Sequence, residues 1–141
     1  MQKLIEMLRK HEGVETHAYK CTADKITIGV GRNIDPAGGL GLSQDEIDYL
    51  LTNDIKRVTA ELDKAFPWFS VLDEVRRYAL IDLCFNLGLT RLKLFRLALG
   101  AMENQDYETA SKEFLDSNWS KQVGTRAITI TDMIRSGLYS T

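Results

Sequence analysis

The side chain with the clearest potential for acid chemistry is Glu12, at the end of a helical pattern. Leu4, Ile5 and Leu8 recur at helical spacing, and Glu12 follows Leu8 by one turn, so we expect it to share their buried face. Gly13 then provides a natural helix stop. Burial and the negative end of the helix dipole both favour the protonated carboxyl, which suits a general acid in glycoside cleavage. The alternative is an ordinary, partly exposed residue in the last helical turn.

Two further candidate side chains, Cys21 and Thr27, lie in the segment after this helix. Residues 15–32 alternate between apolar and polar types around a turn at 22–25, which predicts a β-hairpin. A thiol of ordinary pKa is only a few per cent ionised at pH 7, unless Lys20, Lys25 or a helix terminus lowers that pKa. Taken singly, Cys21 is also consistent with a half-buried hairpin residue and Thr27 with an ordinary strand residue.

The elements that must position these groups are mostly helical. Residues 33–42 hold one of two prolines and three of ten glycines, which predicts a loop. Ser43 and Glu46 form a capping box that opens a long helix ending near Ala65. Segment 71–87 is apolar nearly all round, which predicts a helix buried among others. Further helices are expected near 92–102, 107–115 and 125–136, with residues 104–106 and 118–120 between them.

Composition limits the classes of protein that fit. A chain of 141 residues with 44% hydrophobic content supports one core, and we expect one globular unit. The formal charge of −2 and the lack of a long basic block argue against nucleic acid as a partner. The N-terminal segment is too charged for a signal peptide or membrane span. Cys21 and Cys84 lack metal-ligand spacing and are expected to be free thiols.

The spacing Glu12, eight residues, Cys21, five residues, Thr27 resembles a known catalytic pattern, Glu-x8-(Asp or Cys)-x5-Thr, of the phage-type lysozymes, or endolysin muramidases. Segments 11–32, 72–88 and 118–139 also resemble that family, in its order. The resemblance implies a mainly helical α+β fold formed by residues 1–141 as a single lysozyme-like domain. Its small β-hairpin lobe spans about 13–42. A long helix joins it to a larger all-helical lobe, formed by residues of about 66–141 together with the N-terminal helix.

The resemblance also implies a role for each site residue. Glu12 would protonate the oxygen of the β-1,4 bond between N-acetylmuramic acid and N-acetylglucosamine, and Arg126 would pair with it. Cys21 and Thr27 would lie on the other face of the sugar, where they position the attacking water or Cys21 contacts the anomeric carbon. The remaining substrate contacts implied are Asn33, Phe85 and Asn86. Asn33 also fits a turn residue, and Phe85 a core residue.

The implied biology is that of an enzyme that lyses a bacterial host. The partner would be the glycan strands of peptidoglycan, reached from the host cytoplasm after holin-type release. No cofactor, metal, nucleic acid or stable membrane insertion is expected, and the chain is expected to be a monomer. Arg32 departs from the family, since relatives often have His there. The hairpin lobe is also short, and the chain is mildly acidic where many relatives are basic.

Three other functions fit parts of the sequence. A thiol peptidase or amidase would use Cys21 as nucleophile with His17 or His11 as base, but it lacks an evident orienting residue. An inactive glycan-binding homologue would follow from the replacement of Asp by Cys21. A structural helical protein would explain the capped helix alone. The pattern formed by Glu12, Cys21 and Thr27 together favours the lysozyme.

Overall fold

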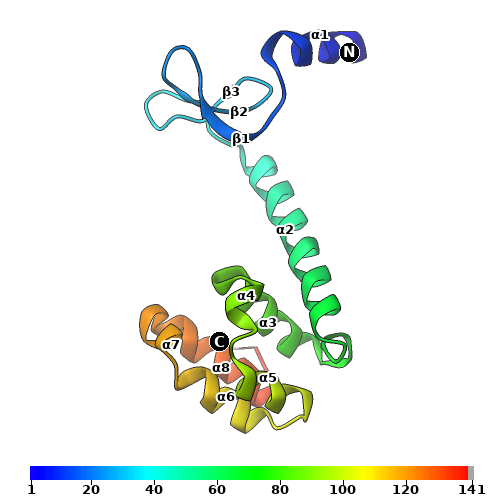
Figure 1. The fold of residues 1–141 in the computed structure, drawn as a ribbon, viewed down its shortest axis with the longest axis vertical. Coiled ribbons are helices and arrows are strands. Elements are labelled where there is room, and N and C mark those ends of the chain that lie inside the picture. The colour runs from blue at the N-terminus through cyan, green and yellow to red at the C-terminus, as the bar shows by residue number, and fades with distance from the viewer. Residues whose placement is uncertain (140–141) are drawn as a thin grey trace. The chain divides into compact units, whose positions relative to one another are not determined.

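The computed structural model describes residues 1–139 and contains two compact units, one formed by residues 1–51 and the other by the chain from Thr52 onward. The N-terminal unit holds a helix and a small antiparallel sheet of order β1-β2-β3 (Figure 1). Its elements are α1 (Gln2–Glu12), β1 (Glu15–Lys20), β2 (Ile26–Gly29) and β3 (Arg32–Asn33). The expected helix and hairpin are both confirmed. Helix α1 falls in this unit, so its predicted place in the helical lobe stays a prediction.

Strand β3 is an element that the sequence did not predict, because residues 33–42 were expected to be a loop throughout. Its two residues pair with β2, with Asn33 opposite Thr27 and Arg32 opposite Ile28. A strand of two residues is too short to produce a detectable alternation. The loop that follows is organised by Asp35, whose carboxylate accepts hydrogen bonds from the backbone N–H of Ile26 at 3.0 Å and of Ala37 at 2.8 Å.

Helix α2 (Gln44–Ala65) begins at the predicted capping box. The Ser43 backbone N–H donates to Glu46 at 2.9 Å, and the Glu46 N–H donates to the Ser43 hydroxyl at 3.4 Å. Arg32 Nη1 binds the same Glu46 oxygen at 2.8 Å, so the cap is tied to β3. The buried residues of this helix, Val58 and Leu62, lie toward its end.

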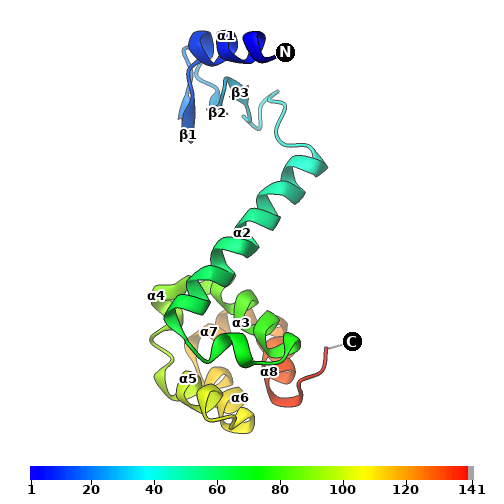
Figure 2. The ribbon, with the colours of Figure 1, turned by 90° about the vertical axis from the view of Figure 1, so that its right-hand side faces the viewer.

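The second unit is all-helical, and both views show its helices gathered into one bundle (Figures 1 and 2). After α2 and the 3-10 turn η1 (Phe69–Val71), it contains α3 (Glu74–Leu87), α4 (Leu89–Leu92), α5 (Arg96–Glu103), α6 (Tyr107–Leu115), α7 (Asn118–Val123) and α8 (Thr125–Ser136). Helix α8 contacts α3, α6 and α7. Helix α3 supplies the centre of the core, as predicted, with its fully buried Ala79, Leu80 and Leu83.

Two predictions in this unit were wrong in detail. The helix expected near 92–102 is divided into α4 and α5, because Phe95 turns inward and lies against Phe114 with 5.3 Å between ring centroids. Residues 118–120 were expected to separate helices but begin α7, which Ser117 caps by accepting a hydrogen bond from the Ser120 N–H. None of the helices within residues 1–139 is both long and apolar enough to cross a membrane.

Candidate active site

Glu12 is the last residue of α1, where Gly13 ends the helix with a positive φ of 79° and donates its N–H to the Arg9 carbonyl at 3.0 Å. The helix end is therefore as predicted. Within its own unit, α1 has no buried residue and the Glu12 side chain is exposed. Burial of the apolar face of α1 against the helical unit stays a prediction.

The Glu12 carboxylate lies directly against the backbone of Gly31, in the turn between β2 and β3. A Cβ atom built at Gly31 would lie 2.7 Å from Glu12 Oε2 and 3.1 Å from Cδ, closer than real Cβ contacts. Gly31 also has a φ of +67°, which side chains rarely adopt. Only glycine therefore fits without displacing the acid. Gly31 lies within segment 11–32, but the sequence did not predict this role, for which a glycine just after a strand was the available signal.

Cys21 and Thr27 are brought together by the turn that joins β1 to β2. Lys20 pairs with Ile26, so Cys21 lies opposite Lys25, whose carbonyl accepts a hydrogen bond from the Cys21 N–H at 3.0 Å. Thr27 is 4% exposed and its hydroxyl lies 2.9 Å from the same Lys25 carbonyl. This places the two predicted side chains in one polar cluster of the N-terminal unit.

Hydrogen bonds lower the pKa of the Cys21 thiol below its usual value. The largest contribution comes from the Lys25 backbone, followed by the Ala23 backbone and the Thr27 hydroxyl. Thr27 has one hydroxyl proton, which either the Lys25 carbonyl or the Cys21 sulfur receives. Ionising the thiol therefore favours rotation of that proton toward sulfur. The sequence pointed to lysine charges, whereas the structure assigns the main effect to backbone groups of the turn.

Asn33 lies opposite Thr27 in the sheet and supports the loop that follows. Its Oδ1 accepts the Asp35 N–H at 2.9 Å, and its carbonyl accepts the Leu40 N–H at 2.8 Å. A Cβ at Gly39 would lie 2.7 Å from that Oδ1, so the amide is covered by the loop backbone. These contacts are those of a turn residue, which was the alternative role that the sequence left open for Asn33. A sugar contact by Asn33 stays a prediction.

Phe85 and Asn86 lie near the end of α3 in the helical unit. Asn86 Oδ1 accepts a hydrogen bond from the indole N–H of Trp119 at 2.6 Å, and Trp119 is itself buried. Phe85 is half-exposed and lines a hollow of about 570 Å³ with residues of α2 and the start of α4. The Phe85 ring is thus accessible, while the side-chain oxygen of Asn86 already accepts a hydrogen bond from Trp119.

Arg126, at the start of α8, pairs with Asp82 of α3. Its Nη2 lies 2.7 Å from the Asp82 carboxylate and its Nε donates to the same oxygen at 2.8 Å. The sequence did not anticipate this partner. Pairing of Arg126 with Glu12 stays a prediction.

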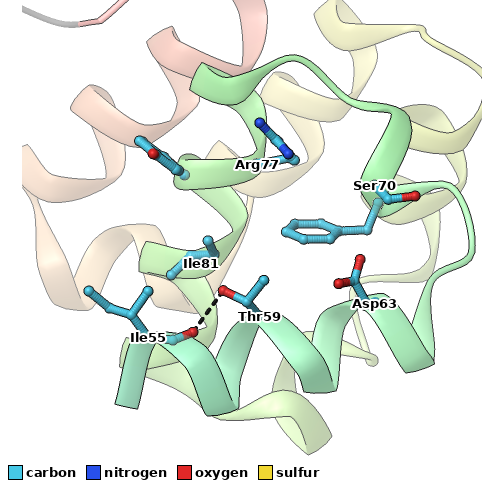
Figure 3. Close-up of a pocket in the computed structure, with 8 residues that line it drawn as sticks. Ile55, Thr59, Asp63, Ser70, Arg77 and Ile81 are labelled. Carbon is cyan, nitrogen blue, oxygen red and sulfur yellow. Dashed lines mark hydrogen bonds between the residues drawn. The ribbon is translucent and has the colours of Figure 1, made fainter. Parts of the chain in front are cut away.

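A separate pocket lies between α2 and α3 in the helical unit (Figure 3). Ile55, Thr59 and Ile81 line one end, and Asp63, Ser70 and Arg77 line the other. The Thr59 hydroxyl donates to the Ile55 carbonyl at 2.7 Å, and Arg77 Nε is buried without a hydrogen-bond partner among the described residues. None of the predicted site residues lines this pocket.

Neither histidine supports the thiol peptidase hypothesis. The His17 ring hydrogen-bonds the neighbouring Thr16 hydroxyl at 3.0 Å, and both His17 and His11 are exposed. The groups that do contact the Cys21 sulfur are the backbone and hydroxyl donors named above. The cluster therefore contains a thiol held by donors but no adjacent imidazole base.

A three-stranded sheet with a helical bundle, 64% helix in all, defines the class as the lysozyme-like α+β fold. The phage lysozyme family model matches residues 9–133, so the chain belongs to the phage lysozyme family. It is accordingly a glycoside hydrolase of the lysozyme type.

Similar proteins come from phages and from a social amoeba. An "Endolysin" of Acyrthosiphon pisum secondary endosymbiont phage 1 is 31% identical over 120 residues, which cover 85% of this chain and 79% of that protein. "Probable T4-type lysozyme 1" of Dictyostelium discoideum is 24% identical, with 97% and 96% covered. The "Pre-baseplate central spike protein Gp5" of Enterobacteria phage T4 is 26% identical, and the match covers 95% of this chain but 28% of that protein.

Proposed function

We propose that this lysozyme cleaves the β-1,4 bond between N-acetylmuramic acid and N-acetylglucosamine in peptidoglycan and thereby lyses a bacterial host. The observation that supports this most is that the Glu12 carboxylate lies against Gly31, next to the sheet that carries Thr27 in β2 and Cys21 in the turn between β1 and β2. A carboxyl group close to the sheet, with a second polar cluster on the same sheet, supplies the two groups that a glycosidase requires.

In the proposed reaction, Glu12 donates its proton to the glycosidic oxygen as the bond to the anomeric carbon breaks. Cys21 and Thr27 hold the attacking water on the opposite face of the sugar, and the water proton passes to the Cys21 thiolate. The lowered pKa of Cys21 supports this role, because it increases the fraction of thiolate near neutral pH. We also propose that Arg126 orients Glu12 and that Asn33, Phe85 and Asn86 contact the glycan.

The first test is to digest purified peptidoglycan and identify the fragments by mass spectrometry. Glu12→Gln keeps the shape of the side chain but removes the acid, so release of fragments with reducing-end muramic acid should fall about 100- to 10,000-fold. Glu6→Gln, on the same helix, is the matched control and should retain activity. Cut peptides on intact glycan strands would contradict the proposal and favour a thiol hydrolase, and no cleavage by the wild type would favour a binding protein.

The role of Cys21 has its own test. Cys21→Asp introduces the residue that many relatives carry, so it should remain active and become insensitive to iodoacetamide, whereas the wild type should be inactivated. Full wild-type activity after alkylation of Cys21, verified by peptide mass spectrometry, would exclude this role. Detection of a covalent glycosyl adduct on Cys21 would show that the thiolate attacks the anomeric carbon directly and does not position the water.

The single-domain arrangement also belongs to this proposal. Helix α1 exposes Leu4, Ile5 and Leu8 within its own unit, and such an apolar face is suited to packing against the helical unit. Ile5→Asp should then lower the melting temperature of the helical unit. A control change on the polar face, Lys3→Asp, should have little effect, and equal melting temperatures for the two variants would contradict the arrangement. Accumulation in the host cytoplasm and holin-type release complete the proposed biology.

A further inference from the structure

The segment Arg91–Leu97 differs in charge from the rest of this mildly acidic chain. Residues 83–102 contain no Asp or Glu, although the full chain has 20 acidic residues among 141. Three cations, Arg91, Lys93 and Arg96, fall within six positions of that stretch. The segment therefore carries a local positive charge that the net charge of −2 conceals.

Two anchors fix which side chains of the segment point outward. Leu92 is fully buried, and Phe95 packs against the core beside Phe114. The residues between and after them, Leu94 and Leu97, are 70% and 73% exposed. Because the inward positions are occupied by Leu92 and Phe95, this exposure is a fixed property of the α4–α5 connection.

The three cations are exposed and make no side-chain hydrogen bond or ion pair with any of residues 1–139. Three other arginines of the helical unit differ, since Arg57, Arg76 and Arg126 each bind a carboxylate. Unpaired cations keep their full charge available to an external anion. The segment thus combines free positive charge with two outward leucines.

We propose that the segment Arg91–Leu97 is a surface that binds anionic lipid bilayers. Cations interleaved with exposed apolar side chains suit the bilayer interface, where leucines enter the acyl boundary and Lys and Arg contact lipid phosphates. A purely polar polyanion would use the cations but would leave Leu94 and Leu97 in water. The patch is small, so it supports reversible association at the bilayer interface and no membrane-spanning insertion.

A shallow hollow next to the segment extends this surface. It is lined by Arg91, Leu94, Phe95, Ser117, Asn118 and Trp119. Along the chain, the acidic residues nearest to the segment are Asp82 and Glu103, and Asp116 directly precedes Ser117 of this lining. None of the six residues that line this hollow is acidic, and Arg91, Leu94 and Phe95 make its edge toward the segment basic and apolar.

Co-sedimentation with vesicles tests the proposal. Wild-type protein should bind phosphatidylglycerol/phosphatidylcholine vesicles at low salt more strongly than pure phosphatidylcholine vesicles, and salt should weaken the binding. Each cation near an anionic surface changes the partition coefficient of the protein between vesicles and water by about five-fold. Replacing Arg91, Lys93 and Arg96 by Gln should therefore reduce partition by up to about 100-fold.

A matched variant separates the position of the charges from net charge. Replacing the exposed Lys56, Lys64 and Lys112 by Gln removes the same charge elsewhere and should change partition only a few-fold. Leu94→Asn with Leu97→Asn should weaken binding further, whereas Val71→Asn, at an 81% exposed position, should not. Digestion of purified peptidoglycan should be unchanged in all of these variants, which also verifies that they fold.

Three results would overturn the proposal. Equal loss of binding in the two triple-Gln variants would assign the effect to net charge. Equal binding to neutral and anionic vesicles, or no binding to either, would exclude an anionic lipid surface. Binding to isolated peptidoglycan that depends on Arg91, Lys93 and Arg96, without binding to vesicles, would assign the segment to a wall polymer instead.

Discussion

The two compact units of the chain are stabilised by different interactions. In the helical unit an apolar core extends from Val58 to Ile134 and includes fully buried side chains on most of its helices. In residues 1–51 the single buried side chain is Thr27, and the loops are organised by Asp35, Arg32 and Glu46 through hydrogen bonds. The candidate catalytic residues Glu12, Cys21 and Thr27 all lie in residues 1–51, the unit that is organised by hydrogen bonds. Precise placement of reactive groups here depends on backbone and polar contacts, and bulk stability depends on the helical core.

The largest effect should come from the apolar core. Leu83→Ala removes a fully buried side chain of α3, so it should lower the free energy of unfolding of the helical unit by about 2–5 kcal/mol. Urea denaturation followed by circular dichroism measures this change. Leu97→Ala, at an exposed position, should cost about 0.5 kcal/mol or less. Similar losses for the two variants would contradict the assignment of this unit's stability to its buried apolar core.

The next effect tests placement in the N-terminal unit. Gly31→Ala and Gly29→Ala both place a side chain at a positive φ, +67° and +68°, but only the Gly31 variant brings a Cβ against Glu12. We expect kcat to fall about 100-fold further for Gly31→Ala than for Gly29→Ala, because displacing a catalytic group by about 1 Å costs that much. In a Glu12→Ala background, Gly31→Ala should destabilise the protein less than in the wild type. Equal kcat losses in the two glycine variants would exclude the positioning role.

A smaller effect concerns the thiol cluster. Thr27→Val removes a hydroxyl that lowers the pKa of Cys21, so that pKa should rise and alkylation by iodoacetamide at neutral pH should slow several-fold. The rate measured as a function of pH reports the shift directly. Thr16→Val, which removes a hydroxyl bonded to His17, is the control and should leave the profile unchanged. A profile for Thr27→Val identical to the wild type would contradict the contact.

The smallest effect comes from the polar cap of α2. Arg32, and then the Ser43 backbone and hydroxyl, lower the pKa of Glu46 from 4.5 to about 2. A depressed carboxyl pKa contributes stability above pH 4.5, and this contribution is lost as the pH falls toward about 2. The stability difference between the wild type and Glu46→Gln should therefore shrink across that window. The exposed Glu103→Gln serves as control, and a difference that does not depend on pH would refute the assignment.

Local patterns in the sequence were sufficient for much of the fold. The helix stop at Gly13 and the capping box of Ser43 with Glu46 depend on neighbouring residues, and both were predicted. Strand β3 and the helix α7 were missed, because each depends on contacts or caps that a short pattern does not reveal. The same distinction applies to the site. Spacing located Glu12, Cys21 and Thr27, but the seat on Gly31 and the Asp82 partner of Arg126 arise only when distant segments meet.

The two free cysteines give the chain one chemical reporter in each unit. Cys21 is partly exposed with a lowered pKa, so a thiol reagent should modify it directly in the native state. Cys84 is 3% exposed, and burial raises its pKa, so it reacts only when the helical core opens. Mass spectrometry can follow both modification rates in one experiment. The rate at Cys84 therefore reports opening of the helical core, and the rate at Cys21 reports the reactivity of the native N-terminal unit. This protein can thus report its own local unfolding without an added label.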